Sequence, residues 1–235
     1  MAAEIIVDGR CAPFLPGQTI MQAAEAAGVY IPHLCHDPRV SPAGNCRLCT
    51  VMVNGRPQPA CISQAAEGQQ VVVQSEELHD LRRALVRMLF VEGNHFCPSC
   101  EKSGSCKLQA MAYYLEVLDF EFPQQFPVRE PDASHPDVLL DRDRCIACGL
   151  CVRASHELDH KGVFELGGRG AATRIMVNSD SGCLVDSAVA VNDEAVAICP
   201  TGALLPKRHA FETPIGKRRF DLAGIDGAGR KEAAR

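Results

Sequence analysis

The sequence predicts an α+β protein built from small modules that surround groups of cysteine residues. Short apolar runs separated by turn dipeptides in residues 1–75 indicate a sheet domain. Apolar residues at helical spacing follow, and most of the 13 cysteines in the 235 residues gather in three groups. The fold and the function are therefore expected to depend on what these cysteines bind.

Residues 1–75 are expected to form the sheet domain. Asp8-Gly9 and Asn54-Gly55 are typical of tight hairpin turns. Thr19 is a suitable N-cap for the Ala-rich segment that Gly28 ends. The expected elements are strands at 4–8, toward residue 14, at 50–53, 57–60 and 70–74, and a helix at 20–27.

Residues 76–119 are expected to form a small helical module. Ser75 is followed by two glutamates, which suits a capped helix start, and Gly93 ends the helix. The apolar residues at helical spacing are Leu78, Leu81, Leu85, Met88 and Leu89. A second helix is expected over 107–118. Four prolines in 120–137 then predict an extended connector.

The last two segments are a third module at 138–206 and a basic tail at 207–235. The tail holds eight Lys or Arg and four Asp or Glu, so it carries +4 while residues 1–206 carry −9. We expect a solvated, partly mobile end. Docking against an acidic partner surface is the alternative.

Net charge, apolar runs and the N-terminal residues argue against several classes of function. A net charge of −5 gives no general case for nucleic-acid binding. No apolar run reaches the roughly 18 residues of a membrane span. Glu4 and Asp8 precede any basic residue, so the N-terminus lacks the order of a secretory signal. We therefore expect no membrane partner and a cytoplasmic protein, in which clustered cysteines bind metal more often than they form disulfides.

The first cysteine group is Cys35, Cys46, Cys49 and Cys61, with the spacing C-x10-C-x2-C-x11-C. Thiolates select iron–sulfur, zinc or copper(I). The loop between Cys35 and Cys46 can wrap a cluster and aim backbone N–H groups at its sulfurs. The spacing differs from that of plant-type ferredoxins, and a four-cysteine zinc site stays open.

The second group is His95, Cys97, Cys100 and Cys106, with the spacing H-x-C-x2-C-x5-C. One imidazole and three thiolates suit zinc as well as a 4Fe–4S cluster. A neutral imidazole in place of a thiolate would raise the potential of such a cluster. The alternative for His95 is an exposed or merely neighbouring histidine.

The third group is Cys145, Cys148, Cys151 and Cys199, and it favours iron–sulfur over zinc. The run C-x2-C-x2-C and the distant Cys-Pro follow the bacterial ferredoxin pattern. Ser155 takes the place of that pattern's fourth cysteine. Counting back from Cys199 gives three further residues that cannot replace thiolates, Ala195, Asn192 and Val189. We expect one 4Fe–4S cluster beside a vacant second site.

Four other residues are expected to have no ligand role. Cys11 is predicted to be a small buried residue of a strand. Cys183 is predicted to be a free thiol near a loop. His33 and His36 flank Cys35 and are expected to lie at the surface or beside the ligands, because four cysteines already fill that site.

The order of the three groups resembles the N-terminal parts of the large iron–sulfur subunit of complex I and of iron-only hydrogenases. Those families usually show H-x3-C where this sequence has H-x-C. Over residues 4–205 the chain most resembles the small diaphorase iron–sulfur subunit of soluble NAD-reducing nickel–iron hydrogenases. Its length favours this stand-alone subunit, because the other two families continue into large catalytic domains.

The resemblance implies three folds and three clusters. It implies a β-grasp ferredoxin domain, a small helical module and a bacterial-ferredoxin-like domain. It implies a 2Fe–2S cluster at Cys35, Cys46, Cys49 and Cys61. It implies 4Fe–4S clusters at His95, Cys97, Cys100 and Cys106, and at Cys145, Cys148, Cys151 and Cys199.

The resemblance also implies an electron-relay subunit of a hetero-oligomer. FMN and NAD would lie on a diaphorase partner, and the nickel–iron centre on hydrogenase small and large subunits. The sequence itself contains neither a dinucleotide-binding G-x-G-x-x-G after a strand nor a P-loop, and 167–170 is interpreted as a hairpin turn.

The route of the electrons is expected to run through the two 4Fe–4S centres. The 2Fe–2S centre would lie off this route or where electrons enter, because it belongs to a separable N-terminal module. The alternatives for the whole chain are the same role in an iron-only hydrogenase, a formate dehydrogenase or complex I, and a zinc-stabilised interaction protein.

Overall fold

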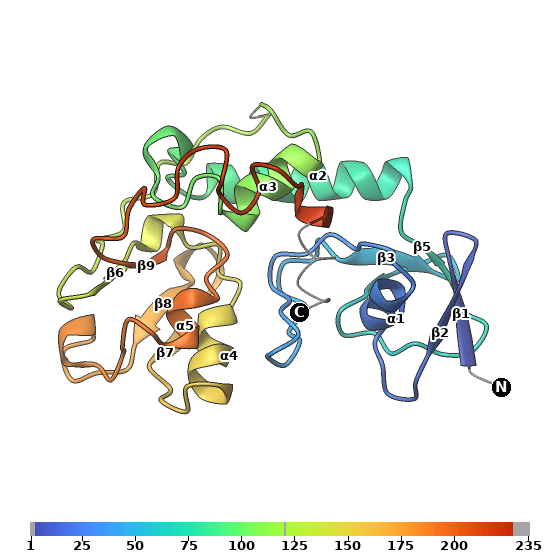
Figure 1. The fold of residues 1–235 in the computed structure, drawn as a ribbon, viewed down its shortest axis with the longest axis horizontal. Helices are drawn as coiled ribbons and strands as arrows, with labels where there is room; N and C mark the ends of the chain where they lie inside the picture. The colour runs from blue at the N-terminus through green and yellow to red at the C-terminus, as the bar shows by residue number, and fades with distance from the viewer. Residues whose placement is uncertain (1–2, 120, 228–235) are drawn as a thin grey trace.

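Three modules form an arch in the computed structural model, which describes residues 3–119 and 121–227. The N-terminal module and the third module lie on opposite sides in Figure 1, and helices α2 (Glu76–Val91) and α3 (Lys107–Tyr114) lie above them. The loop between α1 (Ile20–Ala26) and β3 (Thr50–Val53) lies between the two sides. Within the described residues, no helix is both long enough and apolar enough to cross a membrane.

The N-terminal module is a five-stranded sheet with one helix packed against it. Its other strands are β1 (Ala3–Val7), β2 (Arg10–Phe14), β4 (Arg56–Pro59) and β5 (Gln70–Val72). The order is β2-β1-β5-β3-β4, and β1 pairs with β5 in parallel while the other pairs are antiparallel. Helix α1 shares a buried core with the sheet. This arrangement confirms the β-grasp expectation.

Local sequence explains the bounds of these elements. Asp8 and Gly9, and likewise Asn54 and Gly55, have positive φ, as the two central residues of a type I′ hairpin turn require. The Thr19 side chain accepts from the Gln22 amide, and Gln22 reaches back to the Thr19 amide, so a capping box starts α1.

Helix α2 forms where the apolar spacing predicts it, but not all of the apolar residues at that spacing lie in the core. Ser75 caps it as expected, but Leu81 and Met88 are each 41% exposed. The buried residues include Leu78, Arg82 and Val86, which are spaced four apart. An arginine therefore lies in the middle of the buried stripe. Helix α3 ends at Tyr114 rather than at residue 118.

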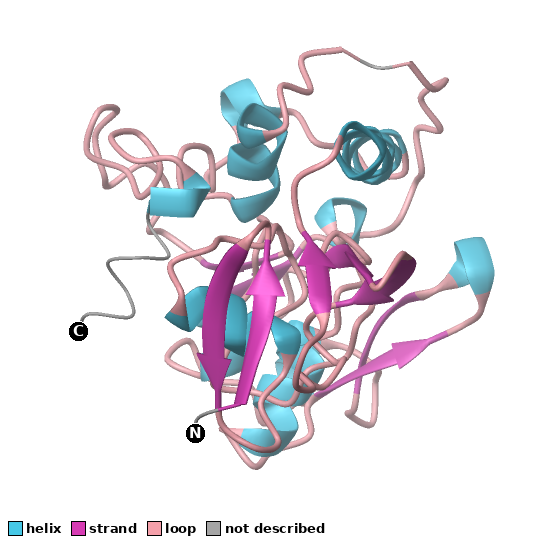
Figure 2. Ribbon diagram, turned by 90° about the vertical axis from the view of Figure 1, so that its right-hand side faces the viewer, coloured by secondary structure: helices cyan, strands magenta, loops and turns pink. Residues whose placement is uncertain are grey.

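The third module has the strand–helix–strand repeat of a bacterial ferredoxin. Strands β6 (Val138–Leu140) and β9 (Leu204–Pro206) pair antiparallel, as do β7 (Phe164–Gly167) and β8 (Arg174–Val177). The predicted hairpin turn at 167–170 lies between β7 and β8. Helices α4 (Leu150–Glu157) and α5 (Glu194–Ala197) complete the repeat. Figure 2 shows how short the strands are and how much loop joins them. The 3-10 helices are η1 (Cys97–Ser99), η2 (Arg142–Arg144), η3 (Gly170–Ala172) and η4 (Leu184–Asp186).

The described part of the basic tail is exposed over 208–217, as expected of a solvated end, but its last part packs against the helical module. The Phe220 amide donates to the Gly104 carbonyl at 2.9 Å. Ile225 is 6% exposed and belongs to the core around α2 and α3. Phe220 and Ile225, two apolar residues of the basic segment, make this contact, and the net charge of the segment could not predict it. Residues 228–235 of the predicted tail lie outside the described residues.

Candidate iron–sulfur sites

The first cysteine group comes together between α1 and the end of β4. The Cys49 and Cys61 sulfurs are 3.3 Å apart. The Cys46 amide donates to the Cys35 sulfur at 3.3 Å, as expected for a loop that aims N–H groups at sulfur. The hydrogen bond from the Cys35 side chain lowers the pKa of Cys46 below that of a free cysteine. The hydrogen bond with the Cys49 side chain likewise lowers the pKa of Cys61, so two of the four thiols lose their protons more easily than a free cysteine.

The second group lines one small cavity. Its walls include His95, Cys97, Cys100 and Cys106. The His95 ring is hydrogen-bonded to the Leu89 backbone, while its Nε2 is buried without a hydrogen-bond partner. Burial lowers the pKa of His95 to about 4, so the ring is neutral at pH 7. A buried, unpaired nitrogen among three thiols is the donor arrangement expected of a metal ligand.

Local backbone features position this second group. Cys106 is the N-cap of α3, and its sulfur accepts from the Gln109 amide at 3.5 Å. Burial raises the pKa of Cys106 to about 12, so its side chain is a protonated thiol at pH 7 when no metal is bound. A Cβ on Gly93 would lie 2.5 Å from His95 Nε2. The glycine therefore leaves space for the imidazole.

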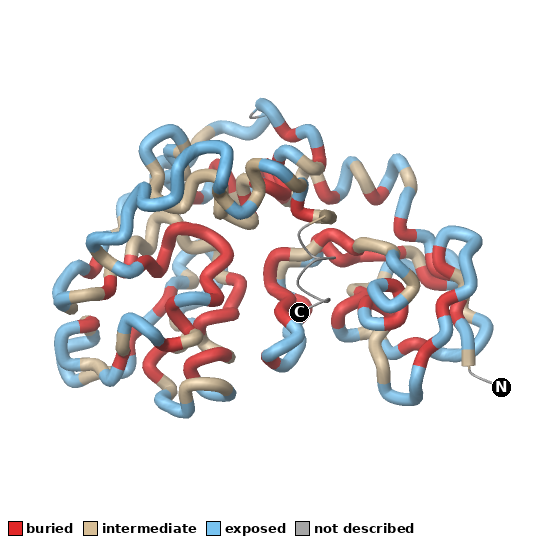
Figure 3. The backbone as a smooth tube through the Cα atoms, viewed as in Figure 1, coloured by how far each residue is buried: buried red, intermediate tan, exposed pale blue. Residues whose placement is uncertain are grey.

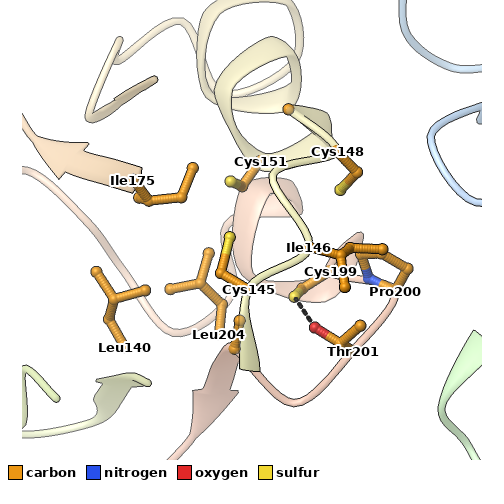
Figure 4. Close-up of a pocket in the computed structure, with 12 residues that line it drawn as sticks. Leu140, Cys145, Ile146, Cys148, Cys151, Ile175, Cys199, Pro200, Thr201 and Leu204 are labelled. Carbon is orange, nitrogen blue, oxygen red and sulfur yellow. Dashed lines mark hydrogen bonds between the residues drawn. The ribbon is translucent and has the colours of Figure 1, made fainter. Parts of the chain in front are cut away.

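The third group surrounds a second cavity with apolar walls. Figure 4 shows Cys145, Cys148, Cys151 and Cys199 around one space between α4 and the neighbouring loops. The Ala147 amide lies 3.4 Å from the Cys145 sulfur, and the Thr201 hydroxyl lies 3.8 Å from the Cys199 sulfur. Burial raises the pKa of Cys145 to about 11 and raises those of Cys148 and Cys151 as well. Iron binding here would release protons.

The expected vacant second site of the ferredoxin domain is filled by protein. Ser155 is 1% exposed, and its hydroxyl accepts from the Val163 amide at 2.8 Å. Val189 and Ala195, which stand where two further ligands would be, belong to the buried core. Side-chain packing therefore occupies the place of a second cluster.

The first and third sites are joined directly. The Asn45 side chain donates to the Cys148 carbonyl at 3.2 Å, and Arg153 donates to the carbonyls of Cys35 at 2.8 Å and Cys148 at 3.3 Å. The loop between α1 and β3 lies in the centre of the arch, where residues 31–37 are largely buried and the tip of the loop is exposed (Figure 3). The loop of the first group therefore contacts the third module directly.

The second and third sites are also joined. The Lys107 amide, next to Cys106, donates to the carbonyl of Pro200, next to Cys199, at 2.8 Å. Arg144, next to Cys145, reaches the Cys100 sulfur at 3.8 Å. Neither Arg144 nor Arg153 was singled out from the sequence. Their only sequence signal is their place near a cysteine, which does not tell where the side chain reaches.

The remaining cysteines and histidines differ partly from expectation. Cys11 lies in β2 but is exposed, because the alternation of the strand points it away from the core. Cys183 is partly exposed beside a turn, as expected. His36 is 8% exposed, and the rings of His33 and His36 contact each other at 5.4 Å between centroids. Both histidines are thus packed beside Cys35 rather than at the surface.

The cysteine sulfurs of the second and third groups surround cavities and do not converge on one point where a single metal ion could bind. In 3–119 and 121–227, no three His, Cys, Asp or Glu side chains are gathered for a single metal ion. None of the 13 cysteines is in a disulfide.

Three family models match successive parts of the chain. Residues 2–76 match a 2Fe-2S iron-sulfur cluster binding domain, and 82–119 match the NADH-ubiquinone oxidoreductase-G iron-sulfur binding region. Residues 138–205 match a 4Fe-4S single cluster domain. The expected 2Fe–2S and 4Fe–4S cofactors are thereby confirmed, and the zinc alternative is not supported.

Whole-chain comparison decides the family. The chain is 40% identical over 227 residues to the gamma chain of the NAD-reducing hydrogenase HoxS of Cupriavidus necator, covering 96% of both chains. It belongs to the family of these NAD-reducing hydrogenase gamma chains. A chain in a crystal structure of an NAD+-reducing NiFe-hydrogenase is 52% identical, with a TM-score of 0.94 and 97% of both chains covered. A component of the NADH-quinone oxidoreductase of Rhizobium meliloti is 30% identical, and this chain spans 26% of it. As a member of this family, the chain is part of a hydrogenase complex of several different chains.

The residues present fit the cofactors of the family. His95, whose buried Nε2 is unpaired, lines a cavity together with three thiols, and the cavity of the third group is bordered by four thiols and apolar side chains. Soft sulfur donors with few competing oxygen ligands are the set that iron–sulfur clusters use.

Proposed function

We propose that the chain is the electron-relay subunit of an NAD-reducing hydrogenase. It works between a flavin- and NAD(H)-binding diaphorase subunit and the small and large subunits that carry the nickel–iron centre. The observation that carries this proposal is the direct contact of three cysteine-lined sites within one short chain. A protein that only needed structural metal would not require its sites to touch.

The proposed ligands are the three groups found by spacing. The 2Fe–2S cluster is held by Cys35, Cys46, Cys49 and Cys61. One 4Fe–4S cluster is held by His95, Cys97, Cys100 and Cys106, and the other by Cys145, Cys148, Cys151 and Cys199. We divide the chain into 1–75, 76–119 and 138–206 around these sites, with a connector at 120–137 and a tail at 207–235.

The clusters would supply one-electron oxidation and reduction. The chain provides the thiolates, the imidazole and the surroundings. Buried apolar walls keep water from the third site, and backbone N–H groups donate to sulfurs at the first and third sites. Since hydrogen bonds and burial set cluster potentials, these contacts decide how readily each site accepts an electron.

The partners are proposed from the family. The complex is a cytoplasmic hetero-oligomer, without nucleic acid or membrane partners. The similarity to a component of an NADH-quinone oxidoreductase keeps the same role in another NAD(P)-linked complex as the second candidate. Native mass spectrometry of the assembly from its host separates the two, because co-purifying hydrogenase subunits support the first.

Replacing Cys148 by Ser tests the relay. The third cluster should be lost, and NAD-linked hydrogen oxidation should stop, while dye-linked hydrogen oxidation by the partner subunits persists. The matched control is Cys183→Ser, because Cys183 lies outside the three groups and should leave both activities unchanged. Normal NAD-linked activity in Cys148→Ser, or stoichiometric zinc in place of iron, would contradict the proposal.

A further inference from the structure

One arginine of the third module reaches into the second site. Arg144 directly precedes Cys145, and its carbonyl accepts from the Thr201 hydroxyl at 2.8 Å. Its side chain instead lines the cavity of the second group, where Nη1 lies 3.8 Å from the Cys100 sulfur. The backbone of this residue therefore belongs to one cluster site and its charge to the other.

Two carboxylates hold the guanidinium in this position. Nη1 donates to Glu101 at 2.6 Å, and Nε lies 2.8 Å from Asp141. The Arg144 side chain is only 22% exposed. A Cβ on Gly202 would lie 3.2 Å from the Cys100 sulfur and 3.3 Å from Arg144 Nη1, so the glycine permits the close approach. The cation is thus fixed by ion pairs and packing rather than free to turn toward solvent.

A fixed cation beside a ligand sulfur changes the redox equilibrium. Reduction adds one negative charge to a cluster, and a positive charge or an N–H donor at its sulfur favours the reduced form. The interaction is stronger at a partly buried site than in water. A guanidinium carries five N–H donors, so it can pair with two carboxylates and still direct an N–H group toward the sulfur.

We propose that Arg144 sets the reduction potential of the second cluster. The proposal rests on the proposed function, because it requires a 4Fe–4S cluster at His95, Cys97, Cys100 and Cys106. It adds that the potential of this cluster depends on the third module, which supplies the cation. Arg144 is a positioning residue and not a ligand.

Potentiometric titration followed by electron paramagnetic resonance tests this in the purified complex. At the wild-type midpoint, Arg144→Met should lower the reduced-to-oxidised ratio of the second cluster about tenfold, which is about 59 mV for one electron. Arg144→Lys keeps the charge and should restore most of the ratio. The control Arg208→Met removes an exposed arginine paired with Asp137 and should change nothing. A separate His95→Cys variant identifies which signal belongs to the second cluster.

A change of opposite sign separates charge from simple damage. Glu101→Gln removes a negative charge beside the same arginine, so the ratio should rise. A purely structural role for Arg144 would not predict a rise. If Arg144→Met fails to assemble, Glu101→Gln still decides the question.

The outcomes are distinct. Ratios within twofold of wild type in both Arg144→Met and Glu101→Gln overturn the role of Arg144; where Arg144→Met does not assemble, an unchanged ratio in Glu101→Gln does so. A wild-type complex without reducible 4Fe–4S signals overturns the proposed function instead.

Discussion

Replacing Arg82 by Met should release helix α2 from the first cysteine site. Arg82 is 2% exposed, and its guanidinium donates to three backbone carbonyls. The acceptors are Leu48 at 3.1 Å, Val73 at 2.9 Å and Thr50 at 2.9 Å. Leu48 and Thr50 lie on either side of Cys49. The arginine therefore holds the backbone around one proposed ligand.

The expected loss is about 3–5 kcal/mol of unfolding free energy. Hydrogen bonds from a charged donor contribute about 1.5–3 kcal/mol each, so three give roughly 5–9 kcal/mol. Returning the guanidinium to water offsets several kcal/mol, since its burial is costly. Met fills similar space but leaves three buried carbonyls without donors, so the net effect remains destabilising.

Urea unfolding of the holoprotein measures this change, followed by circular dichroism and by the visible absorbance of the clusters. The 2Fe–2S absorbance should be lost at lower urea than in wild type. The matched control is Arg83→Met on the same helix, because the Arg83 Nε makes no hydrogen bond. An Arg82→Met protein within about 1 kcal/mol of wild type, with its 2Fe–2S cluster retained, would refute the reasoning.

Three further predictions concern the individual sites. Cys46→Ser should block electron flow from NADH to the hydrogenase subunits, because the first site touches the third; this is measured as NADH-driven hydrogen evolution. Burial lowers the pKa of His33 to about 4, so stability present above about pH 6.5 falls toward pH 4, by at most about 3 kcal/mol. His33→Phe should remove this loss, as measured by unfolding at pH 7 and pH 4.5. Gly104→Ala should lower the free energy of unfolding of the module around the second site by about 1–2 kcal/mol from backbone strain alone, because the φ of Gly104 is +75°. Thermal unfolding measures this loss. A clash between the new Cβ and the Arg218 guanidinium adds to this loss.

Each of these has an outcome that would count against it. Undiminished flow in Cys46→Ser, with both 4Fe–4S signals present, would place the 2Fe–2S site off the route. An equal loss of stability at pH 4.5 in wild type and His33→Phe would exclude the histidine as its cause. Gly216 has φ +90° and open space around it, so Gly216→Ala reports strain without a clash. If Gly104→Ala is no worse than Gly216→Ala, the packing of the tail on this loop does not matter.

Local chemistry was predictable because it acts over a few residues. Thr19 and Ser75 are the caps expected from residue type, and the two hairpin turns follow from Asp8-Gly9 and Asn54-Gly55. The grouping of the cysteines could be predicted for the same reason: C-x2-C spacing brings two sulfurs to one loop. In contrast, the burial of Arg82 in the middle of α2 was not predicted, because a charged side chain interrupts the apolar pattern that identifies a buried helix face.

The sequence by itself therefore determined which side chains could hold clusters and which short elements carry them. Only the tertiary structure decided how the three sites meet. Arg82, Arg144 and Arg153 reach groups 34, 44 and 118 residues away in the chain. An arginine has several donors and a long flexible stem, and no local pattern specifies which distant carbonyl or sulfur it will reach. The packing of Phe220 and Ile225 was decided in the same way, because these two tail residues find their apolar neighbours only after α2 and α3 have come together.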